Sequence, residues 1–223
     1  MTEIKTGTCL CLCRGEARSL TANIGAALKV EDSFIEDSLN SFTSHPLLYY
    51  IEGFFIPDKM HICRHLYERY KDTSLLITNL NAPYIVKTFP KDVTWLTKKA
   101  DIVFGNRDEF EELASINGFQ TMEDLLTDLL TEYTGKKKSI IITDGANAVF
   151  YYEGNSEGIE SDVINVPKVN PEEIVDTTGA GDSFVAGFIY GLIEGKSTRQ
   201  CIELGTEISA KIIKVIGCNL LNE

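Results

Sequence analysis

The chain is constrained most by a ten-residue run near its C-terminus, VDTTGAGDSF (175–184), which lies directly before an apolar, helix-forming stretch. A helix begins with unpaired backbone N–H groups and the positive end of its dipole, so a turn that lets an anion approach them makes a phosphate site. Gly179 and Gly181 permit that approach. Asp182 would fall in the first helical turn, where it could accept a proton from a hydroxyl attacking the same phosphate. The run predicts a kinase centre, with an ordinary capped helix as the alternative.

The same run, continued by AGF (186–188), resembles the C-terminal signature of the ribokinase-like (PfkB) carbohydrate and nucleoside kinases. The resemblance implies that the backbone of Gly179, Ala180 and Gly181 forms an anion hole. It places Thr177 in the same ATP-binding turn and makes Asp182 the catalytic base. ATP and Mg²⁺ are the cofactors that it implies.

Composition excludes several other classes of function. The chain has 223 residues, 43% of them hydrophobic and 24% charged, which is ordinary for a soluble globular protein. Its net charge of −12 disfavours a nucleic-acid partner. No apolar run approaches membrane-spanning length, and the polar start lacks a signal-peptide core. We expect a protein of the cytosol, or of the nucleus, without a membrane partner.

Strand-like and helix-like segments alternate along the chain, which predicts an α/β fold with a mainly parallel sheet. The family resemblance implies a ribokinase-like three-layer αβα sandwich, as a single kinase domain over 1–223. Expected strands are 6–13, 47–53, 75–80, 101–104 and 139–143, with a late antiparallel pair at 148–152 and 163–166. Expected helices are 33–42, 57–70, 107–116, 122–133, 180–192 and 198–215, and 14–18 is expected to be a loop.

Two expected strands end in polar residues, where open α/β sheets place their ligands. The first is followed by FGNRDE (104–109), which could simply start a helix with acidic residues. The family has an Asn-x-x-Glu motif here, so the resemblance implies that Asn106 and Glu109 act on Mg²⁺ through water. The second ends in IITDG (141–145). In related kinases this turn borders the ATP site, so the resemblance implies that Thr143 and Gly145 are candidates for the nucleotide site.

Three further segments resemble the adenosine kinase branch of the family. TGTC (6–9) with RSLTAN (18–23) implies that Arg18 lies at the phosphate-transfer centre, although a solvated surface arginine is the alternative. GFF (53–55) implies that Phe55 stacks on the adenine of the acceptor, although paired aromatics after a strand are usually core. NLNAPY (79–84) resembles a turn beside the substrate, with Asn79 as the matching residue, while Asn81 and Tyr84 depart from the pattern.

The resemblance covers about 6–218 and implies transfer of the ATP γ-phosphate to the 5′-hydroxyl of adenosine. The family's Gly-Gly and Asn segment, its ribose-gripping Asp, most of its lid strands and its last few residues have no match here. We therefore expect an N-terminally truncated kinase, which would be a monomer when complete and could associate through an exposed sheet edge as a fragment. A catalytically silent nucleotide-binding fragment and a sugar kinase of the same fold stay open as alternatives.

Overall fold

The computed structural model describes residues 4–14, 17–41 and 48–217. For residues 13, 14, 17 and 18 it describes the backbone and not the side chain. These residues form two compact units, Met1–His45 and Pro46–Glu223, and each is described by itself. None of the helices in the described ranges is long and apolar enough to cross a membrane. The prediction of one kinase domain over 1–223 stays a prediction.

The first unit is an antiparallel hairpin followed by two short helices. Its elements are β1 (Thr6–Arg14), β2 (Ala17–Gly25), the 3₁₀ helix η1 (Ala26–Lys29) and α1 (Asp32–Asn40). The expected strand and helix are confirmed, although Phe42 lies outside the described residues. The expected loop over 14–18 is wrong, because Arg18 lies in β2 opposite Cys13. Pairing with β1 satisfies the backbone groups of a polar stretch that shows little strand character of its own.

The second unit is built on a six-stranded sheet in the order β3-β4-β5-β6-β7-β8. The first four strands are parallel, and β7 and β8 add antiparallel strands at one edge. The bounds are β3 (Leu48–Glu52), β4 (Leu75–Asn79), β5 (Ile102–Asn106), β6 (Lys138–Thr143), β7 (Ala148–Asn155) and β8 (Gly158–Asn165). The late antiparallel pair is confirmed, and it is longer than the sequence indicated.

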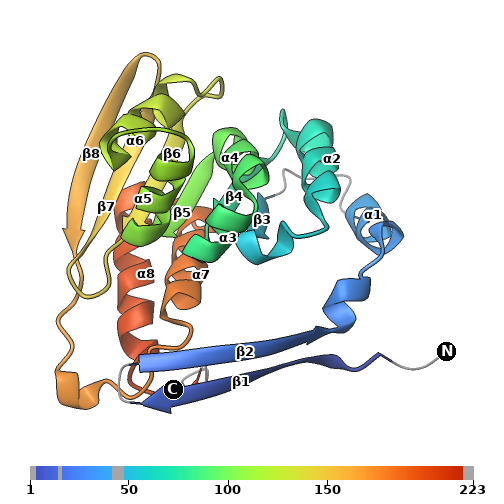
Figure 1. Ribbon diagram of the computed structural model, residues 1–223. Coiled ribbons are helices and arrows are strands. Elements are labelled where there is room, and N and C mark those ends of the chain that lie inside the picture. Colours follow the sequence, from blue (N-terminus) through green and yellow to red (C-terminus); the bar gives the residue numbers. More distant parts are fainter. Residues whose placement is uncertain (1–3, 15–16, 42–47, 218–223) are drawn as a thin grey trace. The chain divides into compact units, whose positions relative to one another are not determined.

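Helices cover both faces of this sheet (Figure 1). One face carries α2 (Met60–Tyr70), α3 (Pro83–Thr88), α4 (Pro90–Lys99), α5 (Arg107–Ile116) and α6 (Met122–Thr131). The other face carries α7 (Ala180–Ile193) and α8 (Thr198–Ile212). Each face has its own apolar core of buried side chains. The predicted three-layer α/β architecture is confirmed.

The central strands are buried on both faces, which explains their continuous apolar sequence. Residues 102–105 of β5 and 140–142 of β6 are all apolar and buried. Such strands end in polar residues only where they leave the core. Because β3 to β6 are parallel, their carboxyl ends meet at one edge of the sheet. This edge is where the second unit gathers its polar side chains.

Candidate active site

The carboxyl edge of the parallel sheet is lined by the last residues of four neighbouring strands. Glu52 ends β3 and pairs in register with Asn79, which ends β4. Asn106 ends β5 and pairs with Thr143, which ends β6. Three of these four are residues that the sequence singled out. Parallel pairing therefore brings polar groups from distant parts of the sequence to one edge.

The start of α7 presents backbone amides without acceptors. Gly179 caps the helix in the left-handed conformation, with φ 78°. Among the described residues, the amides of Gly179, Gly181 and Asp182 donate no hydrogen bond, whereas the amide of Ala180 donates to Thr177. A Cβ added to Gly181 would meet nothing within 4 Å, so the space beside Gly181 is open. Open, unpaired amides at a helix start suit a bound phosphate.

The turn that holds these amides is tied down by Asp176. One carboxylate oxygen of Asp176 accepts from the Thr178 amide at 2.9 Å, and the other accepts from the Gly217 amide at 3.0 Å. Ser209 of α8 donates its hydroxyl to the Ala180 carbonyl at 2.6 Å. The turn and the first residue of α7 are thus fixed from two sides. Fixed donors need little rearrangement when charge develops in front of them.

Asp182 lies exposed in the first turn of α7, as the sequence predicted. Its carboxylate is electrostatically coupled to Tyr50 of β3. Burial, together with the neighbouring Glu52 and Asp182 carboxylates, raises the pKa of the Tyr50 hydroxyl above its usual value. The Tyr50 hydroxyl therefore keeps its proton at neutral pH.

Aromatic packing sets the position of α7 against the sheet. Phe104, near the carboxyl end of β5, is 2% exposed and contacts two rings of α7 edge to face. Its ring centroid lies 6.1 Å from that of Phe184 and 5.0 Å from that of Phe188. Edge-to-face pairs at these distances are favourable. The first turns of α7 are thereby held at the same edge as the strand ends.

Two turns at this edge fit together closely. A Cβ on Gly53 would lie 2.6 Å from the Leu80 carbonyl oxygen, so only glycine fits there. The Gly53 amide donates to the side-chain oxygen of Asn81 at 2.5 Å, and Asn81 also donates to Glu52. Asn81 has a φ of 65°, which asparagine tolerates better than most residues. Asn79 completes the group by donating to the Tyr50 hydroxyl at 3.4 Å.

The two phenylalanines after Gly53 lie in different surroundings. Phe55 is partly buried and packs against the core under α2 to α6. Phe54 is 54% exposed and lies 6.3 Å from the ring of Tyr84, which is itself 59% exposed. The expected stacking role of Phe55 stays a prediction. The exposed Phe54–Tyr84 pair is a second aromatic surface beside the strand ends.

Asn106 and Glu109 form a capping box at the start of α5. The Asn106 side chain accepts from the Glu109 amide at 2.9 Å. The Glu109 carboxylate accepts from the Asn106 amide at 2.8 Å and from the Asn106 side chain at 3.0 Å. Glu109 is 3% exposed, and burial raises the pKa of its carboxyl to about 7. The helix-start interpretation of this motif is therefore confirmed, and its role toward Mg²⁺ stays a prediction.

Replacing Glu109 with Gln should flatten the pH dependence of stability between about pH 5 and 7. A raised carboxyl pKa means that the folded state holds the proton more tightly than the unfolded chain. The resulting stabilisation is complete below the unfolded pKa, near 4.5, and is lost as the pH rises through about 7. The wild type should lose roughly 3 kcal/mol over this range relative to the variant. Urea unfolding at several pH values measures the difference.

The matched control is Glu111→Gln, which removes an exposed carboxylate from the same helix. It should leave the wild-type slope of stability against pH in place. A constant offset in Glu109→Gln at all pH values would reflect only a changed cap. Equal slopes in the wild type and Glu109→Gln would show that Glu109 is ionised normally.

The remaining predicted residues lie in two places. Thr143 ends β6, and Gly145 lies in the turn after it, exposed and with a φ of 54°. Arg107 lies 3.5 Å from Asp144 in the same turn, so a cation accompanies this part of the edge. Arg18 belongs to the first unit, in β2. Its role at the phosphate-transfer centre stays a prediction.

Sequence reasoning assigned no role to Tyr50, Glu52, Asn81 or Asp176. The signal available for Asp176 was its place two residues before a Thr-Gly turn, where a carboxylate commonly accepts from the backbone. The signal available for Glu52 was its place as a polar residue near the end of an expected strand, where open α/β sheets place their ligands. Tyr50 and Asn81 act through partners 29 residues away in sequence, and no local pattern predicts such contacts.

Comparisons with known proteins agree with this arrangement. A family model described as pfkB family carbohydrate kinase matches residues 1–223. The chain is 32% identical to adenosine kinase 1 of Arabidopsis thaliana, and the match covers 96% of this chain and 63% of that protein. The crystal structure of Anopheles gambiae adenosine kinase in complex with P1,P4-di(adenosine-5) tetraphosphate is similar with a TM-score of 0.87 and 28% identity, over 98% of this chain and 65% of that one.

A second solved structure is adenosine kinase from Schistosoma mansoni in complex with 2-fluoroadenosine. It is similar with a TM-score of 0.84 and 29% identity, over 99% of this chain and 66% of that one. The chain thus spans 63 to 66% of the length of these relatives.

Proposed function

The chain belongs to the pfkB family of carbohydrate kinases, and from that premise we propose that it transfers the γ-phosphoryl group of ATP to the 5′-hydroxyl of adenosine. The observation that carries the proposal is the start of α7. There, unpaired amides of Gly179, Gly181 and Asp182 lie beside the exposed Asp182 carboxylate, and the contact between Phe184 and Phe104 holds this helix start near the carboxyl end of β5. The names of the adenosine kinase relatives support adenosine as the acceptor.

In the proposed reaction, Asp182 accepts the proton of the 5′-hydroxyl as its oxygen attacks the γ-phosphorus. The new O–P bond forms while the bond between the γ-phosphorus and the β,γ-bridging oxygen breaks, and AMP and ADP result. The amides at the start of α7 stabilise charge on the transferred group. Asn79 at the end of β4 and its hydrogen-bond partner Tyr50 in β3 would orient the acceptor.

The residues fit a bound magnesium ion only in part. Glu109 is buried and both of its carboxylate oxygens accept hydrogen bonds, so it does not suit direct coordination. Asn106 is exposed at the strand end and suits a contact through water. Mg²⁺ bound with ATP would offset charge on the phosphates.

A coupled assay of ADP release with adenosine, ribose and fructose as acceptors tests the proposal. The exposed Phe54–Tyr84 pair beside the strand ends favours a flat base over a bare sugar. Turnover with adenosine alone would support the proposal. Turnover mainly with a sugar would assign the chain to the sugar-kinase alternative. ATP binding without turnover on any acceptor would favour the silent nucleotide-binding alternative.

Replacing Phe55 with Ala should raise the KM for adenosine far more than the KM for ATP. Stacking and burial of one base against a ring are worth about 1–3 kcal/mol, so a rise of roughly tenfold is expected. Because Phe55 also contacts the core, the variant should lose some thermal stability as well. Steady-state kinetics with each substrate varied in turn, beside a melting curve, separates the two effects.

Phe54→Ala is the control, because Phe54 follows the same glycine but is exposed. A selective rise in the KM for adenosine in Phe54→Ala, and not in Phe55→Ala, would move the stacking role to the Phe54–Tyr84 pair. Equal effects of Phe55→Ala on both substrates would show that Phe55 serves only the core.

A further inference from the structure

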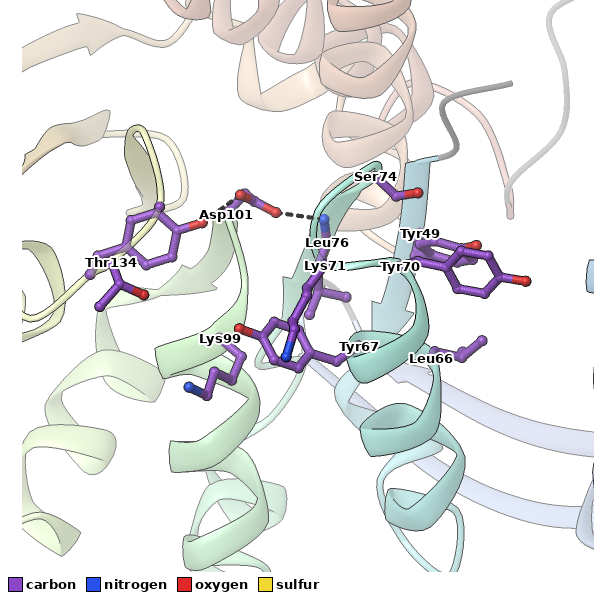
Figure 2. Close-up of a pocket in the computed structure, with 12 residues that line it drawn as sticks. Tyr49, Leu66, Tyr67, Tyr70, Lys71, Ser74, Leu76, Lys99, Asp101 and Thr134 are labelled. Atoms are coloured by element: carbon purple, nitrogen blue, oxygen red, sulfur yellow. Dashed lines mark hydrogen bonds between the residues drawn. The ribbon is translucent and has the colours of Figure 1, made fainter. Parts of the chain in front are cut away.

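The amino-terminal edge of the sheet, opposite the candidate active site, carries a small cavity (Figure 2). Its volume is about 50 Å³, which is room for a few water molecules or one small anion. The end of α2, the turn after it, the end of α4 and the segment before β6 contribute its walls. The lining residues used below are Tyr49, Tyr67, Lys71, Ser74, Lys99 and Asp101. We call this space the amino-edge cavity.

Two ammonium groups share one aromatic ring at the amino-edge cavity. Lys99 lies 5.5 Å and Lys71 lies 5.8 Å from the centre of the Tyr67 ring. Tyr67 is held in turn by an edge-to-face contact with Trp95 at 5.4 Å, and Arg64 lies 4.4 Å over Trp95. This stack of rings and cations fixes the Tyr67 ring between its neighbours. Both lysines thus line the cavity beside the same ring.

The charges around the amino-edge cavity leave a cation available to a ligand. Lys99 has no ion pair among the described residues, whereas Lys71 pairs with Glu68 at 2.6 Å. Asp101 places an acidic group in the same wall, and its oxygens accept from the Leu76 amide at 2.7 Å and from the Tyr133 hydroxyl at 2.5 Å (Figure 2).

A buried lysine lies behind the wall, and burial lowers the pKa of its ammonium group to about 7, so it adds only part of a positive charge at neutral pH. Lys138 is fully buried, and its ammonium donates to the Thr97 carbonyl at 2.7 Å and to the Ala100 carbonyl at the end of α4. It also lies 4.7 Å from the ring of Tyr133. A cation at a helix C-terminus is favoured by the helix dipole.

One polar atom in the wall lacks a good partner. The Tyr49 hydroxyl is buried, and it makes no hydrogen bond of ordinary geometry among the described residues, although Ser74 and Tyr70 are near. A buried hydroxyl without a partner costs free energy, so a ligand that bonds to it would gain affinity.

A larger and more open cleft of about 600 Å³ adjoins the amino-edge cavity and shares Lys71, Ser74 and Asp101 with it. Its remaining walls include Lys136 and Lys137, before β6, and Leu192 and Ile193 at the end of α7. Lys137 pairs with Glu153 at 2.8 Å, whereas Lys136 has no ion pair within the described ranges. A ligand with its anionic group in the cavity would thus have room in the cleft for the rest of its structure.

We propose that the amino-edge cavity binds the phosphate group of a small ligand, either free phosphate or a phosphate ester whose body lies in the adjoining cleft. The cavity is small, and ammonium donors and a hydroxyl line it. Lysine is a common phosphate binder that acts as a point charge. This site is separate from the amides at the start of α7, because it lies at the other end of the strands.

The test is an amide NMR titration of the whole chain with sodium phosphate at constant ionic strength, with sodium chloride as the exchanged salt. Saturable shifts are expected at Ser74, Thr134 and Gly135. Lys99→Met should weaken this binding about tenfold, the usual effect of losing one charged hydrogen bond. The same variant should leave any shifts at Gly181 and Asp182 unchanged.

Lys98→Met is the matched control, because Lys98 precedes Lys99 on α4 but pairs with Asp128 and does not line the cavity. It should bind phosphate as the wild type does. Lys71→Met is a second variant in case Lys99→Met fails to fold. A parallel titration with AMP distinguishes the two sources: added shifts at Leu192 and Ile193 indicate an ester, and their absence indicates free phosphate.

Two outcomes would overturn the proposal. One is the absence of saturable shifts at Ser74, Thr134 and Gly135, and the other is unchanged binding there in both lysine variants. Shifts confined to Gly181 and Asp182 would overturn this site and still support the proposed kinase centre. The two proposals therefore fail independently.

Discussion

Asp182→Asn is expected to lower kcat by about 10²–10⁴-fold and to leave ATP binding near normal, because an amide cannot take the proton of the attacking hydroxyl. The substitution keeps the shape of the side chain and the unpaired amides of Gly179 and Gly181, so the proposed phosphate-binding turn should persist. Removal of the charge costs the start of α7 only about 0.3–1 kcal/mol of dipole stabilisation. Coupled assays of kcat, together with ATP binding by calorimetry, measure both effects.

The control for this prediction is Asp124→Asn, which removes an exposed carboxylate from the first turn of α6. It should cost similar dipole stabilisation and leave kcat unchanged. If Asp182→Asn keeps more than about a tenth of the wild-type kcat, Asp182 is not the base.

The start of α7 could be predicted from sequence because its chemistry is local. Gly179 must adopt a left-handed backbone, Asp182 must fall in the first turn, and both requirements are visible within ten residues. The parallel sheet could be predicted for a similar reason, since alternating strands and helices leave few other arrangements. In these cases the information lies within one or two neighbouring elements.

Residues that act through distant partners could not be predicted in the same way. Asn81 fits against Gly53, and this contact joins two turns that the sequence presented as separate motifs. Their close approach explains why one turn needs glycine and the other tolerates a left-handed asparagine. Tyr50 likewise became part of the site only when the sheet placed it beside Asn79.

The capping box shows how one motif can carry two meanings. Asn106 and Glu109 match a family pattern for Mg²⁺ and also the ordinary chemistry of a helix start. The hydrogen bonds between them establish the second meaning. A residue pair that builds the edge of a site can also contact the ligand.

The strand β2 was missed because its polar sequence depends on pairing with β1.

The packing of Phe104 links the core to the start of α7. Its ring fills the space between β5 and two turns of α7 and is almost completely buried. Phe184 lies only two residues after Asp182. If a smaller side chain replaced Phe104, a shift of α7 into the space left behind would also move the unpaired amides at the start of α7. Misplacement of reacting groups by about 1 Å can cost ~10²-fold in rate.

Phe104→Ala should therefore lower the free energy of unfolding by about 3–5 kcal/mol, the usual cost of emptying a buried phenylalanine site. It should also increase hydrogen exchange at the amides of Val185 to Ile189 in α7. Phe110→Ala is the matched control, since Phe110 is fully buried in the core on the other face. It should cost similar stability, measured by urea unfolding, without a selective rise in exchange in α7. If the two variants raise exchange in α7 equally, or if Phe104→Ala costs less than about 1 kcal/mol, Phe104 does not hold the start of α7 in place.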